Sequence, residues 1–215
     1  MDVLDTLKKQ WQEREQQFPK LSYDDIYSML LKKSSSVVKW IFIISVCELL
    51  FWILISFVVP DSSREFNEQM GLKTAFTIIG VINYIIFAFF LFIFYKNYRT
   101  IKVTATVKQL MESILKTRKT VNYFVYYNVI STALLFIAIN IYYFLHKEEL
   151  TKFLSKSYEG YGSIPQDKAT MVFFGAQIIV GAVFIGLLIL FYYVVYGFLL
   201  RRLKRNYREL KKIEV

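Results

Sequence analysis

Five polar side chains interrupt long apolar stretches of this sequence, and they are the first candidates for chemistry. They are Glu48, Asn83, Asn128, Asn140 and Gln177. An ionisable group in such a stretch costs about 3 kcal/mol on membrane-insertion scales, so Glu48 needs an explanation. Two roles compete: it carries a proton or cation with Asn83 as a ligand or relay, or it is protonated and hydrogen-bonds to Asn83 between helices. No other acid lies at its depth, which favours the structural role.

The residue types elsewhere argue against catalysis. Cys47 is the only cysteine and His146 the only histidine, whereas a metal site needs about four such ligands, or three and a water molecule. Paired carboxylates and the HExxH, GxSxG, Walker A and CxxC patterns are absent from the sequence. No nucleic-acid-binding signature is present either. We therefore expect a protein that is not an enzyme, uses no metal or cofactor, and does not bind nucleic acid directly.

Four apolar stretches are long enough to position these polar groups inside a bilayer. The chain is 55% hydrophobic over 215 residues, and a helix needs about 20 residues to cross the hydrocarbon core. The predicted spans are 37–59, 74–95, 121–145 and 171–200. The sequence thus predicts an all-α, four-helix transmembrane bundle (37–200). Glu48 and Asn83 fall near the midplane, and Asn140 and Gln177 in the outer half, so each pair is predicted to hydrogen-bond.

The distribution of basic residues predicts the orientation. The net charge is +10, and Lys and Arg gather before the first span, in a helical connection (96–120) and in the tail (201–215). Because positive residues are retained inside, both termini are expected in the cytoplasm of a multi-pass inner-membrane protein, with an external loop at 146–170. The tail residues Arg201, Arg202, Lys204 and Arg205 are expected to contact anionic lipids.

Residues 1–36 are patterned as amphipathic cytoplasmic helices. Leu4, Leu7 and Trp11 form one apolar stripe, and Ser22 is predicted to cap a second helix with Asp24 and Asp25 in its first turn, through Ile26 and Met29. Further stripes follow in 103–114 and 200–213, and Leu150, Phe153 and Leu154 indicate a short helix in the external loop. The cytoplasmic stripes have two possible roles. In the more frequent case they pack on one another or lie among lipid headgroups. In the other case they dock a cytosolic protein. The candidate docking face is Leu4, Leu7, Trp11, Ile26 and Met29.

Two longer strings carry a resemblance to known proteins. They are FPKLSYDDIYSMLLKKSSSVVKWIFIISVCE, entering the first span, and VKQLMESILKTRKTVNYFVYYN, entering the third. With them the chain resembles an uncharacterised group of small four-helix membrane proteins of Bacteroidetes-type bacteria. Their association with extracytoplasmic-function sigma factors implies a membrane-tethered regulator that holds a sigma factor through its N-terminal helices. The chain departs from many anti-sigma domains in lacking their His/Cys-x-x-Cys zinc signature and in its shorter N-terminal segment.

The leading expectation is therefore a regulatory or scaffolding membrane protein, anti-sigma-like, that binds a cytosolic partner. The alternative is a small transporter or channel subunit that uses Glu48 and Asn83, as an oligomer because one four-helix bundle leaves little room for a pore. A third, weaker reading of the basic inner surface is an assembly factor that interacts with lipids.

Overall fold

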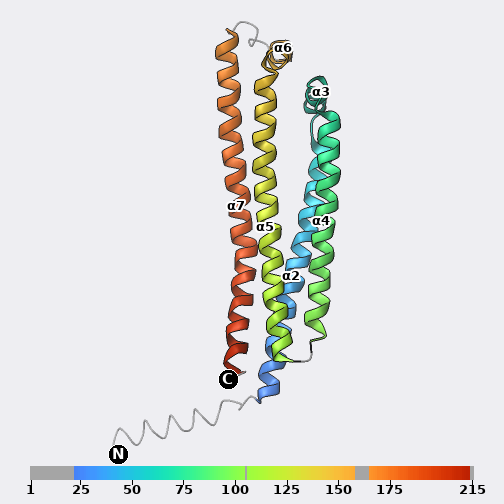
Figure 1. Cartoon of the computed structure of the whole chain (residues 1–215), viewed down its shortest axis with the longest axis vertical. Helices are drawn as coiled ribbons and strands as arrows, with labels where there is room; N and C mark the ends of the chain where they lie inside the picture. The colour runs from blue at the N-terminus through green and yellow to red at the C-terminus, as the bar shows by residue number, and fades with distance from the viewer. Residues whose placement is uncertain (1–21, 105, 158–164, 214–215) are drawn as a thin grey trace, which may run out of the picture.

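The computed structural model describes residues 22–104, 106–157 and 165–213, and every element in these ranges is an α-helix. The long helices form an up-and-down bundle in which each packs on two neighbours in the cyclic order α2, α4, α5, α7 (Figure 1). Two short helices, α3 and α6, lie at one end of it. The helices are α2 (Tyr23–Val58), α3 (Asp61–Gln69), α4 (Lys73–Lys102), α5 (Val107–Leu145), α6 (Lys147–Ser157) and α7 (Gln166–Ile213).

The four long helices are long and apolar enough to cross a membrane, and each contains one predicted span, except that α2 ends at Val58, one residue before the predicted end of the first span. They also continue beyond those spans. Helix α2 begins at Tyr23 because Ser22 and Asp25 form the reciprocal cap of a helix start: Ser22 Oγ accepts from the Asp25 N–H at 3.2 Å, and Asp25 Oδ2 accepts from the Ser22 N–H at 3.1 Å. The predicted cap is confirmed, and the helix runs from it into the span without a break.

One end of the bundle holds the start of α2, the end of α4, the start of α5 and the end of α7 (Figure 1). We call it the basic end. The helices are packed closely here, because the apolar stripes of α5 and α7 face one another and α2. Leu110, Ile114, Leu203 and Leu210 are fully buried in this core, together with Leu30 at 3% exposed. These stripes therefore pack on one another.

The opposite end, which we call the far end, has a second core beneath α3 and α6. The ring of Phe66 in α3 lies 5.5 Å from that of Tyr143 and 4.8 Å from that of Phe153 in α6. The Tyr142 hydroxyl donates to the Met70 carbonyl at 2.7 Å, which joins α5 to the α3–α4 turn. Helix α6 was predicted from its apolar residues, whereas α3 was not predicted.

The ring of Phe136 in α5 packs directly against Gly181 of α7. A Cβ atom at this position would lie 2.1 Å from Cζ of Phe136, so the Phe136 ring occupies the space that any side chain would need. At Gly186, further along α7, a Cβ atom would meet nothing within 4 Å. Small residues let membrane helices approach closely. Of these two glycines, only Gly181 lies where a side chain of the neighbouring helix packs against α7.

We predict that Gly181→Ala destabilises the bundle relative to Gly186→Ala. Both changes improve helix propensity equally, but the first overpacks the α5–α7 contact, at a typical cost of about 1–3 kcal/mol. Thermal unfolding of the two purified variants in the same detergent measures the difference. Equal melting temperatures would contradict the proposed contact.

Candidate functional site

Glu48 lies inside the bundle, where α2 faces α7, and only 7% of its surface is exposed. Its Oε1 accepts a hydrogen bond from Tyr192, and its Oε2 lies 3.0 Å from the Tyr196 hydroxyl. Tyr196 Oη is also 2.9 Å from Ser45 Oγ, and Ser45 Oγ donates to the Ile41 carbonyl at 2.9 Å. We call Glu48, Ser45, Tyr192 and Tyr196 the carboxyl network.

Counting hydrogens indicates which form of Glu48 fits this network. Four oxygen–oxygen contacts run from Tyr192 through Glu48, Tyr196 and Ser45 to the Ile41 carbonyl. Each hydroxyl carries one hydrogen, so the three hydroxyls leave one contact without a hydrogen if Glu48 is a carboxylate. A protonated Glu48 donates to Tyr196, which then donates to Ser45, and every contact becomes a hydrogen bond. The neutral acid also avoids the cost of burying an uncompensated charge.

Helix periodicity positions the four side chains. Ser45 and Glu48 are three residues apart on α2, and Tyr192 and Tyr196 are four apart on α7, so each pair lies on one helix face. Phe124 of α5 is fully buried, and its ring lies 6.2 Å from that of Tyr192 and 5.8 Å from that of Tyr196. Aromatic packing from α5 thus covers a polar contact between α2 and α7.

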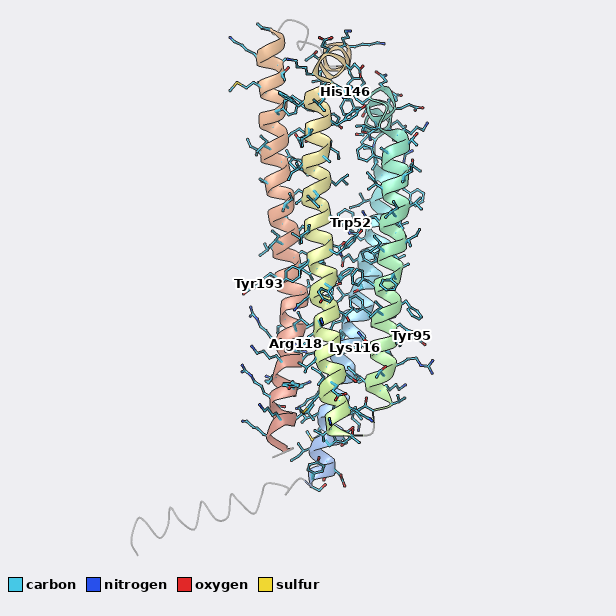
Figure 2. The ribbon with its side chains drawn as sticks, in the orientation of Figure 1. Trp52, Tyr95, Lys116, Arg118, His146 and Tyr193 are labelled. Atoms are coloured by element: carbon cyan, nitrogen blue, oxygen red, sulfur yellow. The ribbon has the colours of Figure 1, made fainter. Side chains whose placement is uncertain are left out.

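A cavity of about 440 Å³ adjoins the carboxyl network toward the far end, and all four long helices line it. Tyr192 reaches its wall together with Asn83 of α4 and Asn128 of α5, and apolar side chains including Trp52 line much of the remainder. Figure 2 shows Trp52 between α5 and the α2–α4 pair. The volume falls within the range of small-molecule sites.

Two polar groups of the cavity wall keep hydrogen-bonding capacity. Asn83 Oδ1 accepts from the Tyr127 hydroxyl at 3.1 Å, and Asn128 Nδ2 donates to the Phe124 carbonyl at 2.8 Å. The other atom of each amide, Asn83 Nδ2 and Asn128 Oδ1, has no hydrogen-bond partner among the described residues. These two side chains therefore offer a donor and an acceptor to the cavity, whose largely apolar wall also carries the hydroxyl groups of Tyr84, Ser131 and Thr132.

The two predicted pairs inside the spans do not form. Glu48 bonds to α7 rather than to Asn83, although Tyr192 contacts Glu48 and lines the same cavity as Asn83. Asn140 donates to the Phe136 carbonyl of its own helix at 2.9 Å, and its Oδ1 is buried without a partner, so it does not bond to Gln177. Matching depth places two residues at one level, but it does not determine which helix each one faces.

Tyr192 and Tyr196 are members of the candidate site that were not predicted from the sequence. Their spacing of four in the middle of a strongly apolar stretch is a signal for a hydrogen-bonding face on α7.

The predicted docking face is only partly described. Leu4, Leu7 and Trp11 lie outside the described residues. Of the other two, Ile26 packs against the core of the basic end, whereas Met29 is 43% exposed. A docking role on α2 therefore depends on Met29.

The four tail cations are all exposed but differ in their surroundings. Arg201 and Arg202 line a groove between α2 and α7. Arg205 lies 3.9 Å from Glu209 one turn later, and Lys204 is outside the groove lining. The structure thus places Arg201 and Arg202 in the lining of the groove, and Lys204 and Arg205 outside it. Of the described residues, none forms a group of three or more His, Cys, Asp or Glu that could hold a metal ion.

We predict that Tyr192→Phe and Tyr196→Phe each lower the free energy of unfolding by about 1–3 kcal/mol, because each leaves a buried oxygen of Glu48 unsatisfied. Tyr126→Phe is the matched control, since Tyr126 is 61% exposed on α5. Thermal unfolding in detergent compares the three variants. If all three unfold like the unaltered protein, the carboxyl network does not hold α2 to α7.

Comparison of the chain with known proteins gives one family match. The match covers residues 24–215, from the first turn of α2 through all four long helices. No curated protein and no solved structure matches the chain. The chain therefore belongs to the family described as Domain of unknown function (DUF8845).

Proposed function

We propose that this protein is a non-enzymatic regulatory or scaffolding protein of the inner membrane that binds a cytosolic partner at its basic end. The observation that carries the proposal is the packed core of that end. Helices α2, α5 and α7 extend past the predicted spans there and bury Leu30, Leu110 and Leu210 against one another. A packed helical platform next to a membrane suits the presentation of a docking surface better than it suits catalysis.

The charge distribution supports a cytoplasmic location for this end, with both termini inside. Basic residues concentrate there, whereas the far end mixes bases with acids such as Glu68 and Glu148. The cations near the basic end include Lys32, Lys33, Lys96, Arg99, Lys102, Lys108, Lys116, Arg118, Lys119, Arg201, Arg202, Lys204, Arg205, Arg208, Lys211 and Lys212. Figure 2 marks Lys116 and Arg118 on the basic-end half of α5.

The partner is proposed to be a cytosolic protein of the sigma-factor kind, held through residues 1–21 and Met29. The resemblance to membrane proteins associated with sigma factors supports this class of partner. Leu30 and Ser34 are buried in the bundle, so α2 belongs to the platform from its first turns. A deletion that tests docking without removing part of the platform must therefore end before Ser22.

We predict that deletion of residues 1–21, or Met29→Glu, releases the partner while the bundle stays folded. Leu115→Glu is the control, because Leu115 is also 43% exposed but lies on α5. Quantitative mass spectrometry of crosslinked complexes from native membranes measures which cytosolic proteins remain bound. The proposal requires a sigma factor that is retained by Leu115→Glu and lost with the other two variants; an identical set of proteins in all preparations would contradict it.

The cavity favours one second candidate, a small transporter or channel subunit. Tyr192 joins Glu48 to a space that Asn83 also lines, so a small polar solute there would meet Tyr192 and Asn83, and a proton would reach Glu48 through Tyr192. Flux in proteoliposomes that disappears in Glu48→Gln and persists in Glu112→Gln, an exposed acid on α5, would select this candidate.

A further inference from the structure

A groove of about 590 Å³ lies between α2 and α7, near the basic end. Leu199, which is 7% exposed, and the half-buried Ile44 line its inner part. Exposed aromatic side chains, Trp40 at 55% and Tyr193 at 62%, stand beside them. Figure 2 shows Tyr193 on the outer side of α7, away from the bundle. The groove is therefore apolar in its depth and accessible from the surface of the bundle.

Two guanidinium groups lie at the basic-end side of this groove. Arg201 Nη2 donates to the Tyr193 hydroxyl at 2.6 Å, and the Arg201 guanidinium is 5.2 Å from the centroid of that ring. The Arg202 guanidinium is 4.3 Å from the ring centroid of Phe198. Stacking on aromatic rings limits the positions that each guanidinium samples, so both cations are held beside the groove.

These two cations have no acidic neighbour. Of the ion pairs in the described part of the chain, none includes Arg201 or Arg202. Arg205, by contrast, has Glu209 within 3.9 Å. Other cations of the basic end, such as Lys204, also lack an ion pair among the described residues, but of the four tail cations only Arg201 and Arg202 line the groove.

We propose that this groove binds one anionic phospholipid, with an acyl chain along Ile44 and Leu199 and the phosphate at Arg201 and Arg202. A ligand that fits must be apolar at one end and anionic at the other. Arg binds phosphate oxygens with its planar fork of donors, and Trp and Tyr such as Trp40 and Tyr193 favour the headgroup level of a membrane. A soluble anion would satisfy only the charged side of the groove, and a neutral lipid only its apolar depth.

The proposed lipid site depends on the membrane location that is part of the proposed function. It does not depend on the proposed cytosolic partner. Each cation close to an anionic headgroup changes lipid affinity about fivefold, so loss of both guanidinium groups is expected to weaken binding roughly 25-fold. Loss of Lys211 and Lys212 removes equal charge from the same helix. These lysines follow about 15 Å further along the axis, beyond the Debye length of about 8 Å, so their loss is expected to change binding less than about twofold.

The test is a titration of the full-length protein, in a neutral detergent, with phosphatidylglycerol and with phosphatidylcholine, followed by native mass spectrometry. We expect one phosphatidylglycerol to bind preferentially, and this preference to disappear in Arg201→Gln/Arg202→Gln but to persist in Lys211→Gln/Lys212→Gln. Ile44→Trp keeps every charge but fills the groove, so it is expected to weaken phosphatidylglycerol binding as well.

Four results would overturn the proposal. Equal binding of the two lipids would remove the anionic headgroup from the argument. Equal losses in the two double variants would indicate diffuse attraction to the whole tail. Unchanged binding in Ile44→Trp, or competition by inorganic phosphate as strong as that by the lipid, would show that the apolar groove is not used. None of these results bears on whether deletion of residues 1–21 releases a protein partner.

Discussion

A carboxyl group in the apolar interior of a membrane bundle is stable only if it is neutral or paired, and this constraint shapes the middle of the molecule. Among the described residues Glu48 forms no ion pair; it contacts two tyrosine hydroxyls and, through Tyr196, the hydroxyl of Ser45. A neutral acid closes the chain of hydrogen bonds, and the contact fixes α2 against α7. Phe124 then packs on both tyrosines and extends the contact to α5.

The carboxyl network also divides the bundle into two unlike parts. Toward the basic end, one connected core of buried side chains extends from Phe124 to Leu210. Toward the far end the same helices line a cavity, and a separate core beneath α3 and α6 closes that end. The packed part suits a platform for a partner, whereas the cavity suits a small ligand. Tyr192 belongs to both parts, so a ligand in the cavity would touch the group that locks the helices together.

Local chemistry made much of the fold predictable from the sequence. The four spans follow from apolar length, and the start of α2 follows from Ser22 and Asp25, which need only each other. The contacts of Glu48 were not predictable in the same way, because a helix pattern does not specify which neighbour a given face meets. Helix α3 is strongly polar, and its one aromatic anchor, Phe66, finds its partners far away in the sequence, in α5 and α6.

The most direct test of the central claim is the infrared spectrum of the purified protein at neutral pH, compared with that of Glu48→Gln. The account predicts a carboxylic C=O stretch in the unaltered protein that is missing from the variant, because Glu48 holds a proton in the network. A difference spectrum that contains only carboxylate bands would show that Glu48 is ionised, and the hydrogen-bond chain from Tyr192 to Ile41 would have to be replaced by a different one.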